Sequence, residues 1–192
     1  MSYVATFCTA NLPANLAESA VPTLSIIRTP DQKEFEEWTP WPVHEFTTGF
    51  LGMSELDIIR FHQQLYQARA YGATGIAPGW VAVLDEDSAR QSTVVLYRLE
   101  KTTDYWFDEG KDLRVGNFKE YDDGYFFWKW RMPASHIYTA VSFVDHVREE
   151  ALEIYCHPEL TGPDGIFDVA KFDKVLDQEV ELPTWRKGMA SL

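Results

Sequence analysis

Several features that would assign a function directly are scarce in this chain of 192 residues. Cysteine occurs only at Cys8 and Cys156, without a CxxC pair, which excludes a disulfide framework and predicts two buried thiols. Basic residues are few, with 17 Lys and Arg against 30 Asp and Glu, so the formal net charge is −13. Such a surface repels phosphate groups, and we expect no binding of nucleic acid or of anionic membranes.

Long apolar stretches are also missing. No segment approaches about 18 uninterrupted apolar residues, so the sequence predicts no transmembrane helix. The first 27 residues contain no Lys or Arg and are interrupted by Pro13 and Pro22, which argues against a Sec-type signal peptide. We therefore expect a cytoplasmic or virion protein rather than a secreted or membrane protein.

Motifs that carry chemistry are absent as well. The five histidines show no HxxxH or HExxH spacing, and neither a P-loop nor a GxGxxG motif occurs. The acidic clusters lack the alternating ligands, turn glycine and closing Glu of a calcium loop. The sequence thus predicts no metal, no cofactor and no catalytic residue.

The clearest regular element is a helix over residues 54–72. Ser54 can cap its start and Gly72 its end. One stripe of this segment is apolar, formed by Ile58, Phe61, Leu65 and Ala68. The opposite side is rich in glutamine, which is typical of a solvated face and compatible with a protein contact.

β-Strand patterns occupy much of the rest. Residues 80–84 and 93–99 predict a hairpin with an acidic tip, and residues 115–133 predict a second hairpin around Asp123 and Gly124. In its second arm, alternate residues from Phe126 to Met132 share a core face. We also expect a strand over 136–144, while periodicity leaves 145–156 open between helix and strand.

The last part of the chain is acidic and ends in a predicted helix over 168–178, capped by Asp168. Residues 145–181 contain only three cations, Arg148, Lys171 and Lys174. The acidic residues there number eleven: Asp145, Glu149, Glu150, Glu153, Glu159, Asp164, Asp168, Asp173, Asp177, Glu179 and Glu181. This region is either a solvated face or a surface for a basic partner.

Together these patterns predict an α+β, β-dominated fold. We expect an antiparallel sheet or sandwich with one packed helix at about 54–72 and a C-terminal helical appendage. The expected division is a β-rich core domain, 1–160, followed by the appendage, 161–192.

Aromatic residues make up 15% of the chain and gather on predicted loops beside acidic residues. Trp and Tyr bury large areas at low entropic cost, so such loops are typical of interfaces. The residues we expect to bind a partner are Trp38, Trp41, Tyr105 and Trp106 on loops, with Gln63 and Gln67 on the helix.

Two stretches, 22–31 and 123–133, resemble the strand–turn–strand segments of β-sandwich modules in tailed-bacteriophage virion proteins, such as tail, neck and head accessory proteins. The resemblance covers about twenty residues. It implies a non-enzymatic structural or adaptor subunit that works in a symmetric assembly, as a homo-oligomer with protein partners.

The sequence therefore favours a non-enzymatic protein that acts through protein–protein contacts. Two alternatives remain open at this point. One is an enzyme or binding protein for a small molecule, with a pocket between sheet and helix where His62 or His136 acts as acid or base. The other is an acidic inhibitor or immunity-type protein that uses residues 145–181 against a basic active site.

Overall fold

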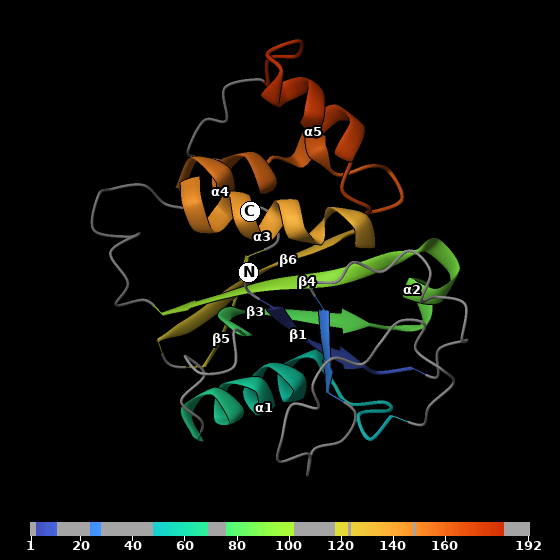
Figure 1. Cartoon of the computed structure of the whole chain (residues 1–192), viewed down its shortest axis with the longest axis vertical. Helices are drawn as coiled ribbons and strands as arrows, with labels where there is room; N and C mark the ends of the chain where they lie inside the picture. Colours follow the sequence, from blue (N-terminus) through green and yellow to red (C-terminus); the bar gives the residue numbers. More distant parts are fainter. Residues whose placement is uncertain are drawn as a thin grey trace, which may run out of the picture.

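One sheet lies at the centre of the molecule (Figure 1). The computed structural model describes residues 3–10, 24–27, 48–68, 76–101, 118–122, 124–147 and 149–182. Within them the sheet has six strands in the order β2-β1-β3-β4-β6-β5. The strands are β1 Tyr3–Cys8, β2 Leu24–Ile27, β3 Ile76–Leu84, β4 Thr93–Lys101, β5 Phe118–Asp122 and β6 Tyr125–Pro133.

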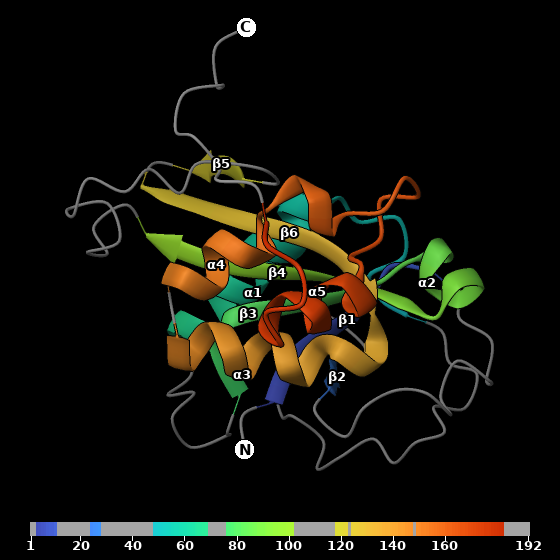
Figure 2. The same cartoon turned by 90° about the horizontal axis from the view of Figure 1, so that it is seen from above.

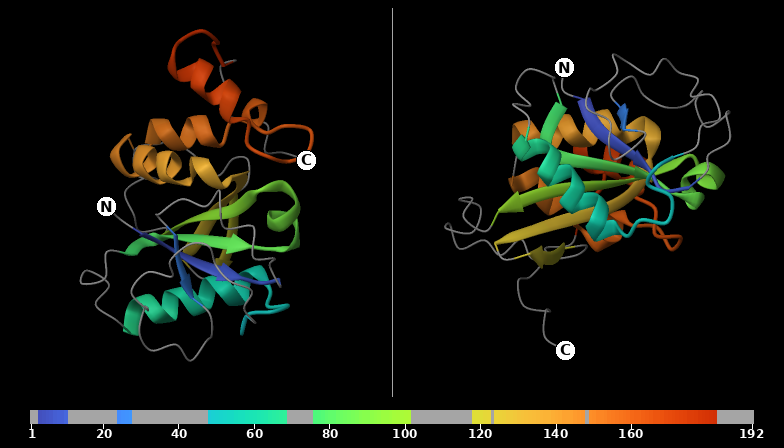
Figure 3. Two further views of the ribbon diagram at one scale, coloured as in Figure 1. Left: turned by 45° about the vertical axis from the view of Figure 1, so that its right-hand side comes forward. Right: turned by 90° about the horizontal axis from the view of Figure 1, so that it is seen from below.

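Helices cover both faces of this sheet. Helix α1, Glu55–Ala68, lies on one face, and the opposite face carries α3, Ile137–Val147, α4, Glu149–Tyr155, and α5, Val169–Leu176 (Figure 1, Figure 3). Helix α2, Glu86–Gln91, joins β3 to β4 at one end of the sheet (Figure 2). Two short 3₁₀ helices, η4 at Ala134–His136 and η5 at Pro158–Leu160, precede α3 and follow α4.

Strand alternation divides the buried side chains into two cores. On β6, Phe126, Trp128, Trp130 and Met132 face α3, α4 and α5, as the sequence predicts. Phe127 points the other way, into a smaller core under α1. The central strands β3 and β4 are apolar on both faces along most of their length because both faces are covered there.

Helix α1 forms where the sequence predicts a helix. The Ser54 hydroxyl accepts a hydrogen bond from the Asp57 backbone N–H at 3.3 Å, which satisfies one of the free donors of the first turn. Ile58 and Ile59 are fully buried against the sheet. The expected end at Gly72 lies outside the described residues.

Both predicted hairpins are confirmed. β3 pairs antiparallel with β4, and β5 pairs antiparallel with β6. Gly124 lies in the second turn with φ 77°, a conformation that favours glycine. In the first hairpin the acidic tip is a helix rather than a loop: Asp85 caps α2, and its side chain and Ser88 each accept from the other's backbone N–H.

The sheet departs from the expected antiparallel arrangement at one side. β1 pairs in parallel with both β2 and β3, whereas the other three pairs are antiparallel. The sheet is therefore mixed and mostly antiparallel. The mixed fold with a packed helix is confirmed, and the described residues form one sheet with helices on both faces.

The strand predicted over 136–144 is wrong, because this segment is η4 followed by α3. Its β-branched and aromatic residues resemble a strand in composition. Ile137, Ala140, Val141 and Val144 are nevertheless buried at helical spacing, so tertiary packing decides the outcome. In the undecided segment 145–156, the structure has the end of α3 and then α4.

The C-terminal helix is confirmed as α5, with the Asp168 side chain accepting from the Lys171 backbone N–H at 2.9 Å. Phe167 and Phe172 are buried in the same core as Trp128 and Met132 of β6. The described part of the predicted appendage, 161–182, therefore completes the core on this face of the sheet. Cys8 and Cys156 are free and buried, as predicted.

Candidate functional site

Most of the predicted binding residues lie outside the part of the chain that the structure describes. Trp38, Trp41, Tyr105 and Trp106 lie outside the described residues, and so does the side chain of Gln67. Gln63 is placed: its amide Nε2 donates a hydrogen bond to the hydroxyl of Tyr121 on β5. This contact ties α1 to the sheet inside the chain.

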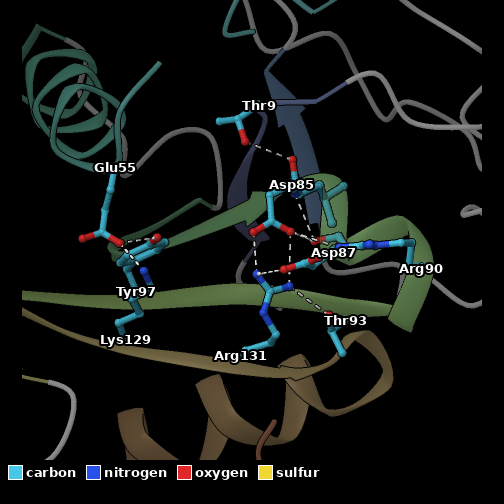
Figure 4. A network of polar contacts seen from close by, with 11 residues as sticks. Thr9, Glu55, Asp85, Asp87, Arg90, Thr93, Tyr97, Lys129 and Arg131 are labelled. Atoms are coloured by element: carbon cyan, nitrogen blue, oxygen red, sulfur yellow. Dashed lines mark hydrogen bonds and ion pairs between the residues drawn. The ribbon is translucent and has the colours of Figure 1, made fainter. Parts of the chain in front are cut away.

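A cluster of charged side chains that sequence reasoning missed lies on the α1 face of the sheet (Figure 4). Glu55, in the first turn of α1, accepts a hydrogen bond from the Tyr97 hydroxyl of β4 at 3.0 Å. Its carboxylate also pairs with Lys129 of β6 and, at 3.4 Å, with Lys119 of β5. Tyr97 and Lys129 are direct cross-strand partners, so strand register brings them to one helix terminus.

This environment changes the acidity of its members. Burial alone would raise the pKa of Glu55, but hydrogen bonds and charges from Lys129, Tyr97 and Lys119 lower it below its ordinary value. Burial and the adjacent Glu55 charge raise the pKa of Tyr97. At neutral pH the cluster therefore contains a stable carboxylate and a stable neutral phenol.

A second charged cluster lies beside the first (Figure 4). Arg131 of β6 forms a two-point pair with Asp85, with Nη2 to Oδ2 at 2.5 Å and Nη1 to Oδ1 at 3.2 Å. The same guanidinium donates to Thr93 at 3.1 Å. Burial alone would raise the pKa of Asp85, but Arg131 and Ser88 lower it below its ordinary value. The pair fixes α2 to the neighbouring strand β6.

Neither cluster has the electrostatics of an acid–base catalyst. A general acid needs a carboxyl whose pKa is raised toward neutrality, and Glu55 and Asp85 are both shifted the other way. Each carboxylate is also neutralised by cations of β5 or β6. These side chains hold α1 and α2 against the sheet.

The signal for these clusters is partly present in the sequence. Lys129 and Arg131 alternate with the predicted core residues of β6 and therefore stand on its opposite face. Their partners Glu55 and Asp85 are remote in sequence, and no spacing rule connects them. Only the fold brings these groups together.

The two histidines considered as acids or bases lie on opposite faces of the sheet. His62 of α1 is buried against the sheet, with its ring 6.2 Å from that of Phe7 on β1. His136 is buried on the other side, between β6 and the C-terminal helices, and its Nε2 lies 2.8 Å from the Tyr155 hydroxyl. The two rings therefore belong to separate cores.

The acidic C-terminal region is exposed where the structure describes it. Glu159 pairs with Lys171, and Asp145 with Arg98. The exposed acidic side chains between 145 and 182 are Asp145, Glu153, Glu159, Asp164, Asp168, Asp173, Asp177, Glu179 and Glu181. The region thus presents many carboxylates to solvent and few cations.

Within the described ranges, no three His, Cys, Asp or Glu side chains gather closely enough to hold a metal ion. In that same part of the chain, no helix combines the length and apolar character that crossing a membrane requires.

The fold defines a mixed α/β protein in which the charged pairs of Glu55 and Asp85 hold α1 and α2 on the sheet. Comparison with protein-family models, with curated proteins and with solved structures finds no match for this chain. Its function must therefore be argued from the chain's own surfaces.

Proposed function

We propose that this chain is a non-enzymatic structural or adaptor subunit that acts through protein–protein contacts. The observation that carries the proposal is the distribution of charge. On the α1 face, Glu55 and Asp85 are matched by cations of β5 and β6. The helical layer formed by α3, α4, η5 and α5 lies on the opposite face. There, nine described carboxylates are exposed between residues 145 and 182, and the described cations are Lys171 and Lys174.

The matched charges support this proposal because they are occupied within the chain. Breaking the Arg131–Asp85 pair to bind or transform a substrate would leave partly buried charges without partners. The cluster is therefore better suited to rigidity than to turnover.

The excess of exposed carboxylates over cations supports a protein partner with a basic surface. Carboxylates spread over α4, η5 and α5 create a negative potential that attracts a cationic patch and accelerates encounter. Exposed apolar side chains lie in the same layer, with Tyr138 on α3 and Leu176 on α5. Aromatic and aliphatic groups of this kind supply buried area once a partner has docked.

A more specific form of the proposal is a subunit of a phage virion assembly. It rests on the resemblance of 22–31 and 123–133 to β-sandwich segments of tailed-phage proteins. In such an assembly the chain would act as a symmetric homo-oligomer, and the aromatic residues Trp38, Trp41, Tyr105 and Trp106 would contribute to the interfaces.

The first test is the oligomeric mass, measured by light scattering at about 0.05 M and about 0.5 M salt, where the screening length differs severalfold. A closed oligomer supports the structural-subunit form. A monomer that captures a basic protein from its source cells, and loses it at the higher salt, supports an adaptor or an acidic inhibitor.

A charge-reversal variant makes the test specific. Replacing Asp177, Glu179 and Glu181 by Lys should abolish the partner or oligomer contact, since these side chains are exposed. Glu86→Lys on α2 is the matched control, because it reverses an exposed charge outside this layer. A monomer that binds no partner with or without these changes would refute the proposal.

A further inference from the structure

His136 sits inside a cluster of aromatic rings that joins four segments of the chain. Its ring stacks on Phe167 with centroids 5.6 Å apart and planes at 23°, and meets the edge of Phe172 at 5.1 Å. Tyr155 of α4 contacts both phenylalanines, at 4.8 Å and 5.0 Å. His136 itself is only 5% exposed.

This cluster is the principal apolar contact of the segment 161–182. Phe167 and Phe172 are the buried residues of that segment in the described structure. Around them are a few polar contacts. The Phe167 N–H donates to the Arg131 carbonyl at 2.8 Å, and the Asp168 N–H donates to the Leu160 carbonyl at 2.8 Å. A change at His136 therefore acts on the docking of the whole segment.

We propose that His136 is a pH sensor that controls the docking of segment 161–182, which includes α5, on the rest of the fold. The segment is docked when the imidazole is neutral and is released locally when the imidazole is protonated. This inference goes beyond the proposed protein–protein contacts and stands whether or not a partner is found.

The chemistry of the cluster explains the direction of the switch. Nε2 of His136 faces the Tyr155 hydroxyl, which can donate to the neutral ring. A protonated ring donates at that nitrogen, so the phenol must accept and turn its own hydrogen toward apolar neighbours. Burial also raises the pKa of Tyr155, so the phenol does not ionise to compensate.

The charged and titratable groups that face the ring set the size of the effect. They are the Tyr155 hydroxyl on α4 and the Asp173 carboxylate on α5, while the 161–168 segment contributes the uncharged ring of Phe167. Burial lowers the pKa of His136, and Asp173 opposes only part of that effect.

The pH window follows from that direction. In the undocked state His136 has its ordinary pKa of about 6.5, which is higher than in the docked state. The undocked state therefore binds more protons in acid, and docking weakens as the pH falls below about 6.5. The loss levels off once the pH is below the pKa of the docked state.

The first experiment follows the five histidines of the intact wild-type chain by NMR, using isotope-labelled imidazole rings. We expect His136 to titrate below the ordinary histidine pKa of about 6.5, because burial lowers its pKa. A His136 pKa at or above about 6.5 would overturn the proposal.

Hydrogen exchange on the same sample measures docking directly. After correction for intrinsic rates, the amides of Phe167 and Asp168 should lose protection between about pH 7.5 and about pH 5.5, by up to about tenfold for each unit by which docking lowers the pKa. Amides of β4 should keep theirs. Equal losses in β4 would mean that acid weakens the whole fold, and no loss at Phe167 would mean that His136 does not control docking.

Variants separate the sensor from its surroundings. His136→Gln keeps a hydrogen-bonding group beside Tyr155 but cannot gain charge, so the pH dependence of exchange should disappear. His157→Asn keeps an acceptor for the Glu159 N–H and should retain the wild-type dependence. If His136→Gln fails to fold, Asp173→Asn provides the second variant, because loss of that carboxylate should move the titration of His136 and the loss of protection to lower pH together.

Discussion

At the residue scale, Glu55 holds the first turn of α1 against the strands β4, β5 and β6. Glu55→Gln keeps an acceptor for the Tyr97 hydroxyl but removes the charge that Lys129 and Lys119 share. We expect a loss of about 1 kcal/mol in the free energy of unfolding at neutral pH, measured by urea denaturation.

The pH dependence of this loss identifies its cause. Because the folded state lowers the pKa of Glu55, its stabilising contribution is present above the unfolded pKa of about 4.3 and disappears as the pH falls through the folded value. Wild type and Glu55→Gln should therefore converge in stability once the pH is below the folded pKa of Glu55. The control is Glu120→Gln, an exposed carboxylate of β5, which should change stability by less than about 0.5 kcal/mol. A difference for Glu55→Gln that persists in acid would point to packing rather than charge.

A second residue-scale prediction concerns the Arg131–Asp85 pair. Asp85→Asn keeps an acceptor for Ser88 and preserves a good cap, but it leaves Arg131 without its carboxylate. We expect a loss of about 2 kcal/mol, since both side chains are partly buried and the pair has two contacts. Asp87→Asn nearby, with its more exposed carboxylate, should cost much less. If Asp85→Asn and Asp87→Asn lower the free energy of unfolding equally in urea denaturation, the Arg131–Asp85 pair is not the main stabilising contact of this cluster.

At the element scale, β5 is the edge of the described sheet and pairs there with β6 alone. An edge strand offers unpaired backbone groups to other chains, and charged side chains discourage such pairing. Glu120→Val removes a central exposed charge from β5, so we expect self-association on concentration, seen by light scattering, with little change in monomer stability. Glu86→Val on α2 makes the same exchange off the edge and should remain monodisperse relative to wild type. If both variants associate equally, general hydrophobicity and not the strand edge is responsible.

The elements also show how much of this fold the sequence could predict. The helix after Ser54 and the turn at Gly124 were predictable, because caps and positive-φ turns are local signals. Segment 136–144 was not, since its composition favours a strand and only burial against the sheet selects the helix. The parallel pairing of β1 with β3 was not predictable either, because it depends on contacts between residues far apart in sequence. For the Glu55 cluster, strand alternation predicts that Lys129 lies on the face of β6 opposite the core residues. Its pairing with Glu55 was not predictable, because only the tertiary structure brings α1 to that face.

At the scale of the whole molecule, the net charge of −13 opposes compact folding through self-repulsion, whereas the local pairs at Glu55 and Asp85 oppose unfolding. Salt screens both effects, but the repulsion acts over longer distances between exposed groups and is screened first. We therefore expect the Tm to rise by about 2–4 °C between about 0.02 M and about 0.3 M sodium chloride, measured by calorimetry. The triple variant Asp173→Asn/Asp177→Asn/Glu179→Gln removes part of the excess of exposed negative charge. It should raise the Tm at low salt and reduce the dependence of the Tm on salt. A Tm that falls with salt would instead mean that the paired clusters dominate the electrostatics of folding. Repulsion among the exposed carboxylates between residues 145 and 182 would then not destabilise the fold. That result would weaken the argument that this surface stays acidic in order to bind a partner.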